Sequence, residues 1–166
     1  MSGERVAIIT GAASGIGRAA VELFTERGTK VVAVDLSADG LSWAAGRDDV
    51  VTVAGDVSQP ATNAAMVQAA VDTWGRLDWA FLNAGVVGSP PIEGDGAADR
   101  LDEILAINVR GVMLGIRHCA PAMRAAGGGS IVATASTSGM RGDPGSWAYN
   151  ASKAAVINLV RAAAID

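Results

Sequence analysis

The chain has 166 residues, of which half are hydrophobic and 18% are charged, and its formal net charge is −4. This length and composition exclude a disordered chain and are sufficient for one domain with a hydrophobic core. The acidic balance offers no basic surface for nucleic acid or an anionic membrane, and no apolar run is long enough to span a bilayer. A single cysteine, Cys119, excludes an internal disulfide, and Met1 to Arg5 carry no basic-then-apolar leader. We therefore expect a soluble cytoplasmic protein with one domain over residues 1–166.

The first element is an apolar strand, Val6–Ile9, followed by a glycine-rich turn and a helix with amphipathic spacing. Gly11, Gly15 and Gly17 have the spacing G-x-x-x-G-x-G, and glycine lets the backbone turn tightly and approach a ligand closely. The first turn of the helix presents free N–H groups and a positive dipole end, which suit a pyrophosphate. A turn that only packs the helix on the strand is the alternative.

A second buried strand over residues 30–35 ends in Asp35, which lies 18 residues after Gly17. In dinucleotide-binding domains, an acidic residue near this position bonds the adenosine ribose hydroxyls. Its charge repels a 2′-phosphate, and no Lys or Arg stands at 12–14 or 36–37 to attract one. The pattern favours NAD over NADP, while an aspartate that only caps a turn is the competing interpretation.

The rest of the chain continues to alternate strands with helices. Such alternation predicts an α/β fold with right-handed crossovers, in which ligands bind at the carboxyl ends of the strands. The predicted strand ends carry Gly11–Gly17, Asp35, Asp56, Asn83 and Ser136. Beyond residue 35, strands are expected at 50–54, 77–82 and 130–135, and helices at 38–48, 60–74, about 99–124 and 149–166.

Three polar residues in this pattern are open to more than one interpretation. Asp56 follows the third strand and could bond an adenine amino group or cap a turn. Asn108 lies in the apolar stripe of the long helix and needs a hydrogen-bond partner if it is buried, in a functional or a structural role. His118, the one histidine, lies beyond the predicted strand ends and is expected to be a surface or packing residue.

Tyr149 and Lys153 are four residues apart, so they share one helix face. Tyr149 is the only tyrosine and Lys153 is one of two lysines. A phenol with a pKa of about 10 is a poor base at neutral pH, but a nearby ammonium favours the phenolate. Ser136, at the end of the adjacent strand, can bond a substrate oxygen. Together the three side chains could deprotonate an alcohol while hydride leaves its carbon, whereas a solvated helix face is the alternative for the pair alone.

Over essentially its whole length the chain resembles the short-chain dehydrogenase/reductase family of the classical type. The resemblance rests on ordered motifs: Thr10-Gly11-x-x-x-Gly15-x-Gly17, Asp56, Asn83-Ala84-Gly85, Asn108, Ser136 and Tyr149-x-x-x-Lys153. It implies a Rossmann-type doubly wound parallel sheet in the order 3-2-1-4-5. It also implies an NAD-dependent oxidoreductase that interconverts a secondary alcohol and a ketone.

The resemblance assigns a role to each matching residue. Tyr149 is the general acid/base, Lys153 lowers its pKa and binds ribose, Ser136 orients the substrate oxygen, and Asn108 holds a water in a proton relay. The residues implied to bind the cofactor are Thr10, Gly11, Ser14, Gly15, Ile16, Gly17, Asp35, Asp56, Val57, Asn83, Ala84, Gly85, Tyr149 and Lys153.

Members of that family continue beyond the last helix with two further strands, an intervening helix and a substrate loop. We therefore expect a C-terminally incomplete domain that lacks the last two strands. In the family the two longest helices pack between subunits, so a homo-oligomer, a dimer or a tetramer, is expected. A non-catalytic nucleotide-binding or interaction module is the alternative function, and isomerase or lyase chemistry on the same scaffold is a third.

The substrate is expected to be a small-molecule alcohol or ketone. The residues that could line its pocket are mostly apolar, and they do not indicate which class of alcohol or ketone binds there. They are Val86, Val87, Gly88, Ser138, Met140 and Trp147.

Overall fold

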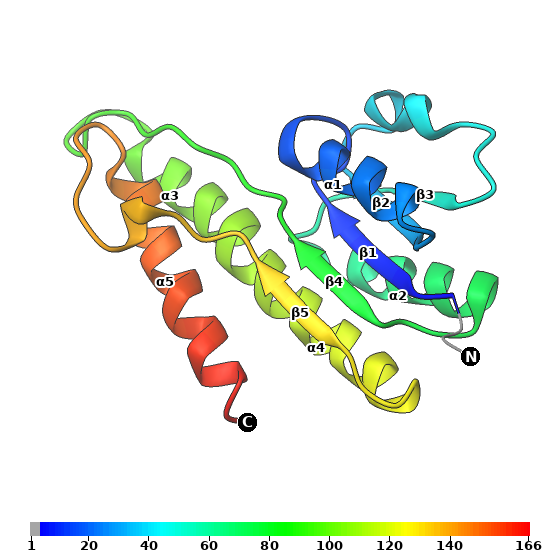
Figure 1. Ribbon diagram of the computed structural model, residues 1–166. Coiled ribbons are helices and arrows are strands. Elements are labelled where there is room, and N and C mark those ends of the chain that lie inside the picture. Colours follow the sequence, from blue (N-terminus) through cyan, green and yellow to red (C-terminus); the bar gives the residue numbers. More distant parts are fainter. Residues whose placement is uncertain (1–3) are drawn as a thin grey trace.

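Five parallel strands form one sheet in the order β3-β2-β1-β4-β5 in a computed structural model that describes residues 4–166. The order and the parallel direction confirm the predicted Rossmann-type fold (Figure 1). The prediction that Met1 to Arg5 carry no leader falls partly on residues 1–3, which lie outside the described residues. The strands are β1 (Val6–Thr10), β2 (Lys30–Asp35), β3 (Val50–Ala54), β4 (Trp79–Leu82) and β5 (Ser130–Ala133).

Helices cover both faces of the sheet, with α1 on one face and α2 and α4 on the other (Figure 1). The α-helices are α1 (Gly15–Glu26), α2 (Pro60–Trp74), α3 (Ala97–Leu105), α4 (Gly111–Ala125) and α5 (Trp147–Ala163). The other helical segments are the 3₁₀ helices η1 (Asp39–Ala44) and η3 (Thr137–Gly139) and the π-helix η2 (Ala106–Arg110). Of the part of the chain that the structure describes, no helix is long and apolar enough to cross a bilayer.

The core forms on both sides of the central strands because β1 and β2 carry continuous apolar runs, residues 6–9 and 31–34. Ile8 and Val32 face Met66 of α2 and Val112 of α4, whereas Ile9 and its neighbours in β2 face α1. All five residues of β1 are buried. A continuous apolar run therefore marks the central strands of this sheet, as expected for strands that helices cover on both faces.

One region of the sheet is not covered by a helix in the part of the chain described here. On the α1 side, β4 and β5 border an open groove of about 730 Å³ lined by aromatic and aliphatic side chains, among them Phe24, Trp79, Phe81 and Val132. Val132 is 56% exposed, and the Phe24 and Trp79 rings meet edge to face at 5.7 Å between centroids. Among residues 4–166, β5 has a strand neighbour on one side only. This groove lies toward the amino ends of the strands, away from the end where the candidate site is found.

The long helix predicted over residues 99–124 is interrupted. The helical rod begins at Ala97, but the π-helix η2 separates α3 from α4, and the N–H of Gly111 bonds the carbonyl of Ala106, five residues back. A π turn accommodates one extra residue and is often found at functional sites. Here it carries the buried side chain of Asn108, whose partners lie outside the rod.

The other predicted boundaries shift by a few residues. The fourth and fifth strands are shorter than predicted, since pairing begins at Trp79 and ends at Ala133. The segment 38–48 forms only the short η1, and the last helix begins at Trp147 and ends at Ala163. The helix over 60–74 has the predicted bounds, and Gly75 ends it in the left-handed conformation.

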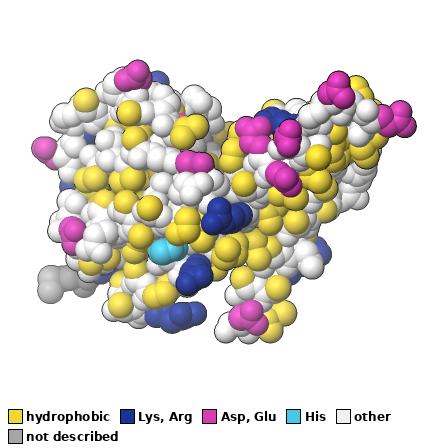
Figure 2. All heavy atoms as spheres, turned by 180° about the vertical axis from the view of Figure 1, so that it is seen from behind, with side chains coloured by type: hydrophobic (Ala, Val, Ile, Leu, Met, Phe, Trp, Pro, Cys, Tyr) yellow, Lys and Arg dark blue, Asp and Glu magenta, His cyan; other side chains and the backbone are white. Residues whose placement is uncertain are grey.

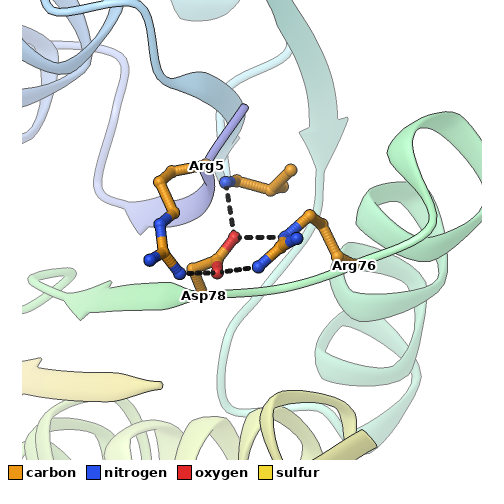
Figure 3. Close-up of polar contacts among 4 residues, drawn as sticks. Arg5, Arg76 and Asp78 are labelled. Atoms are coloured by element: carbon orange, nitrogen blue, oxygen red, sulfur yellow. Dashed lines mark hydrogen bonds and ion pairs between the residues drawn. The ribbon is translucent and has the colours of Figure 1, made fainter. Parts of the chain in front are cut away.

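An ion cluster around one buried carboxylate joins the amino ends of β1 and β4 (Figure 3). The carboxylate of Asp78 is 1% exposed and bonds Arg5 Nη1 and Arg76 Nη2, each at 2.6 Å, while the N–H of Val6 donates to its Oδ2 at 2.9 Å. Burial by itself raises the pKa of Asp78, but these donors outweigh burial and lower the pKa to about 2. The cluster therefore holds Asp78 ionised and lies far from the glycine-rich loop.

Candidate functional site

The glycine-rich loop joins β1 to α1 as the sequence predicts, and two of its glycines have left-handed backbones. Gly11 has φ 71° and Gly15 has φ 53°. A Cβ on Gly17 would overlap the carbonyl oxygen of Gly11 and lie 2.6 Å from its carbonyl carbon. The loop therefore folds back onto the first turn of α1 at a distance that only glycine permits.

The first turn of α1 keeps its backbone donors available. Ser14 stands at the N-cap but makes no side-chain hydrogen bond to the turn, and no acidic residue lies within the turn. Ile16 is 66% exposed, and a Cβ on Gly15 would meet nothing within 4 Å. An uncapped helix start beside an open loop is a favourable place for an anion.

A hydrogen-bond network joins the carboxyl ends of β1, β4 and β5. Thr10 Oγ1 accepts from the N–H groups of Asn83 at 2.9 Å and Ala84 at 3.0 Å. Asn83 Nδ2 donates to the carbonyl of Thr10 at 3.2 Å, and Thr134 Oγ1 donates to Asn83 Oδ1 at 3.0 Å. Thr10 and Asn83, both predicted cofactor contacts, thus brace the three strand ends against one another.

Asp35 is bonded to the glycine-rich loop itself. Its Oδ2 accepts from the N–H of Ala13 and its Oδ1 from the N–H of Ser37, both at 3.0 Å. The carboxylate thereby stabilises the turn after β2 and the loop after β1. Both interpretations of Asp35 remain compatible with this position, because a carboxylate oxygen can accept more than one hydrogen bond.

Asp56 caps the turn that leads into α2. The N–H and the hydroxyl of Ser58 donate to its two carboxylate oxygens, each at 2.8 Å. Burial tends to raise the pKa of Asp56, but the hydrogen bonds from Ser58 outweigh burial and the pKa is lowered. The turn-capping interpretation is therefore observed, and the adenine contact stays a prediction.

Six of the fourteen residues predicted to bind the cofactor line one cleft of about 180 Å³ at the carboxyl ends of the strands, and the other eight do not line it. Gly85 packs closely against Asn108 and Lys153, because a Cβ there would be 3.1 Å from Asn108 Oδ1 and 3.5 Å from Lys153 Nζ. The cleft thus adjoins the residues expected to carry the chemistry. Its lining includes Gly11, Asp35, Asp56, Val57, Ala84 and Gly85.

Lys153 is a buried cation beside Tyr149. It is 3% exposed, its Nζ lies 5.6 Å from the centroid of the Tyr149 ring, and it donates to the carbonyl of Thr134 at 2.7 Å. Burial lowers the pKa of Lys153. No carboxylate among residues 4–166 lies within ion-pair distance of it. A buried ammonium next to a phenol and without a carboxylate is typical of a functional site.

Asn108 is fully buried in the π turn, and its amide is committed to the protein. Its Oδ1 accepts from the N–H of Val86 at 2.8 Å, and its Nδ2 donates to the carbonyl of Val86 at 2.9 Å and to Ser152 Oγ at 3.0 Å. These contacts tie the segment after β4 to α5. The predicted water contact of Asn108 stays a prediction, since its side chain acts as a structural clamp here.

Ser136 follows β5 at the start of η3. Its Oγ accepts from the N–H of Ser138 at 3.1 Å and caps this short helix. The loop that follows ends beside the loop after β4, where Trp147, the first residue of α5, donates through Nε1 to the carbonyl of Pro90 at 2.8 Å. Figure 1 shows these two loops side by side at the end of the molecule where α5 begins.

Four residues that sequence reasoning did not single out contribute to this arrangement. The carbonyl of Thr134 accepts from Lys153, and Ser152 Oγ accepts from Asn108. Arg100 donates to the carbonyls of Val87 and Gly88. Asp143 accepts from Ser138 and Arg141. Ser152 lies inside the Tyr149–Lys153 motif, but the sequence does not show which distant side chain will lie beside it in the fold. His118, predicted to be a surface or packing residue, lies half-buried in α4 and is the cyan side chain in Figure 2.

Comparison with known proteins identifies the family. The family model described as short chain dehydrogenase matches residues 5–166. The 2-(R)-hydroxypropyl-CoM dehydrogenase of Xanthobacter autotrophicus is 38% identical over 170 residues, covering 98% of this chain and 68% of that protein. Levodione reductase of Leifsonia aquatica is 38% identical over 171 residues, covering 98% of this chain and 64% of that protein. The chain belongs to the short-chain dehydrogenase/reductase family.

A solved structure agrees with this assignment. The crystal structure of a short chain dehydrogenase/reductase from Burkholderia phymatum in complex with NAD is 36% identical and has a TM-score of 0.88. The match covers 96% of this chain and 58% of that one. The chain thus spans between 58% and 68% of the length of the three relatives.

Proposed function

We propose that the protein is an NAD-dependent oxidoreductase that interconverts a secondary alcohol and a ketone. The observation that carries this proposal is Lys153, a buried ammonium without a carboxylate, placed beside the only tyrosine and the candidate nucleotide cleft. Two relatives are named 2-(R)-hydroxypropyl-CoM dehydrogenase and levodione reductase, and these names support this class of chemistry. A non-catalytic nucleotide-binding module is the second candidate, favoured by the amide of Asn108, which is committed to hydrogen bonds with Val86 and Ser152.

The residues around the cleft suit a dinucleotide by their close backbone approach and their hydrogen-bond donors. The loop at Gly11 and Gly17 leaves no room for a Cβ, and the uncapped first turn of α1 offers N–H groups to a pyrophosphate. Asp35, at the end of β2, suits ribose hydroxyls and disfavours a 2′-phosphate by charge. The relative from Burkholderia phymatum in complex with NAD supports this choice of cofactor.

When bound, NAD would supply the nicotinamide ring that accepts or returns hydride at the substrate carbon. Tyr149 would exchange a proton with the substrate oxygen through its hydroxyl. Lys153 would stabilise the phenolate by its charge, because its Nζ lies 5.6 Å from the ring centroid and is not neutralised by a carboxylate. Ser136 would hold the substrate oxygen, and Asn108 would keep Val86 and Ser152 in place around the site.

Substituting Tyr149→Phe should lower turnover of secondary alcohols by about 10²–10⁴-fold, because the ring stays and only the proton-exchanging hydroxyl is lost. NADH formation with a panel of secondary alcohols measures the effect, and NADH binding by fluorescence serves as the control for an intact cleft. Unchanged turnover would exclude Tyr149 as the general acid/base. Tight NADH binding by the unaltered chain without turnover of any alcohol would favour the binding module, and turnover without net NADH would favour isomerase or lyase chemistry.

Substituting Asp35→Asn should shift the ratio of the Kd values for NADPH and NADH by about tenfold in favour of NADPH. The variant keeps the size of the side chain and an acceptor for Ala13 or Ser37 but removes the charge that repels a 2′-phosphate. Titration of both dinucleotides by fluorescence measures the ratio. Asp39→Asn in η1, an exposed aspartate, is the matched control, and an equal shift in both variants would contradict a specific role for Asp35.

We infer that copies of the chain associate through the rod formed by α3, η2 and α4. The rod formed by α3, η2 and α4 is charged unevenly, with acidic side chains toward its beginning and exposed arginines further along (Figure 2). Met113 of α4 is 37% exposed on the rod. An antiparallel pair of such rods would place the acidic end of one copy on the basic stretch of the other. The exposed charged residues of the rod are Asp99, Asp102, Glu103, Arg110, Arg117 and Arg124.

A further inference from the structure

The segment made of η3 and the loop that leads to α5 connects two residues of the proposed site, Ser136 just before η3 and Tyr149 in the first turn of α5. Near its middle lies Asp143, whose side chain is 31% exposed. Asp143 Oδ2 accepts from Ser138 Oγ at 2.6 Å, and its Oδ1 accepts from Arg141 Nε at 3.0 Å. Its backbone carbonyl accepts from Asn150 Nδ2 at 3.0 Å. Asp143 thus bonds both Ser138, which precedes the loop, and Asn150, which follows it.

On the side of β5, the contact with Asp143 continues to Ser136. Ser138 donates its hydroxyl to Asp143 and its N–H to Ser136 Oγ at 3.1 Å. The next residue, Gly139, lies directly on α5, because a Cβ there would be 2.6 Å from the carbonyl carbon of Lys153. Ser138 is therefore fixed between Ser136, Asp143 and the turn of α5 that carries Lys153.

On the side of α5, the contact with Asp143 continues to Tyr149. Asn150 is the next residue after Tyr149, and its N–H bonds the carbonyl of Ser146 at 2.8 Å in the first turn of the helix. Its side chain reaches back to the carbonyl of Asp143. The orientation of this first turn, and with it of Tyr149, thus depends on where Asp143 lies.

We propose that Asp143 is a positioning residue that sets Ser136 and Tyr149 relative to each other, through Ser138 on one side and Asn150 on the other. The proposal rests on the proposed function for its effect on turnover. Small errors in the placement of reacting groups reduce the rate far more than they reduce binding. Asp143→Ala keeps the backbone carbonyl that Asn150 bonds but removes the carboxylate that anchors it to Ser138. It should therefore lower kcat and leave the KM for the alcohol and the Kd of NADH almost unchanged.

The test compares Asp143→Ala, Ser138→Ala and the double variant, with kcat and KM measured for a secondary alcohol and NAD. We expect kcat to fall by about 10–100-fold in Asp143→Ala and by about tenfold in Ser138→Ala, with KM within about threefold of the unaltered chain. The double variant should match Asp143→Ala, because both substitutions remove the same hydrogen bond. Arg141→Ala, which removes an exposed ion-pair partner, is the control and should stay within about twofold.

Losses that multiply in the double variant, an effect confined to KM, or an Arg141→Ala variant as impaired as Asp143→Ala would each overturn the proposal. A second measurement does not need turnover. Arg141 is a trypsin site whose side chain is 70% exposed in this loop, and Asp143→Ala should speed cleavage after Arg141 at least about fivefold by loosening the loop. Unchanged cleavage would overturn the proposal even if the unaltered chain turned over no alcohol, whereas absent turnover with faster cleavage would contradict only the proposed function.

Discussion

Replacing Gly17 with alanine should lower the free energy of unfolding by about 4 kcal/mol, a large fraction of the stability of an ordinary domain. The added Cβ would overlap the carbonyl oxygen of Gly11, and Gly11 cannot retreat easily. Any displacement would press it toward Asn83 Nδ2 and the Cα of Ala84, which lie 3.0 Å and 3.1 Å from its own Cβ position. Urea unfolding followed by far-UV circular dichroism measures the loss, and NADH titration measures what remains of the cleft.

Gly142→Ala is the matched control for Gly17→Ala. Nothing lies within 4 Å of the Cβ position at Gly142, and its φ is not in the left-handed region, so its stability should change by less than about 0.5 kcal/mol. If Gly17→Ala kept a free energy of unfolding within about 1 kcal/mol of the unaltered chain, the loop would have room to move. The tight fold-back of the loop would then not be what requires glycine at this position.

Replacing Asp78 with asparagine should lower the free energy of unfolding at neutral pH by roughly 3 kcal/mol, because it leaves two arginines without their buried counter-charge. Asparagine has nearly the same shape, so the loss reports charge and hydrogen bonding rather than a cavity. Urea unfolding at neutral pH measures it. Asp49→Asn is the control: Asp49 also bonds an arginine, Arg47, but is 33% exposed, and its loss should cost less than about 1 kcal/mol.

The contribution of Asp78 should also depend on pH in a direction that its pKa determines. Folding lowers the pKa of Asp78 from 3.8 to about 2, so the folded state favours the ionised form. The stabilisation, about 2 kcal/mol by linkage, is fully present above the unfolded pKa of 3.8 and is lost as pH falls toward 2. The difference between the unaltered chain and Asp78→Asn should therefore narrow between pH 4 and pH 2. A difference that stays constant over this range would show that Asp78 does not titrate as described.

Local patterns were sufficient to predict the sheet and several element boundaries. The apolar runs of β1 and β2 predict buried parallel strands, and Pro60 and Gly75 mark the start and the end of α2 as observed. These features depend on backbone preferences within a few residues. Six of the predicted cofactor residues line one cleft for a similar reason, since parallel strands bring their carboxyl ends to a common edge.

Contacts between distant segments could not be predicted in the same way. The π turn at Asn108 depends on Val86, 22 residues earlier, and on Ser152, 44 residues later. Helical periodicity alone therefore predicted one uninterrupted helix there. The amide of Asn108 was correctly expected to need partners if buried, but which partners it finds depends on how α5 packs on the rod.

The uncovered groove between α1 and β5 has a thermodynamic consequence. Phe24, Trp79, Phe81 and Val132 line it, so part of the apolar surface of these side chains is hydrated before the chain unfolds. Unfolding then exposes less new apolar surface than full burial of the same residues would, and both the heat-capacity change and the urea m-value scale with that surface. The stability curve of this chain should accordingly be flatter with temperature, and its unfolding less sensitive to urea, than its length of 166 residues alone would suggest.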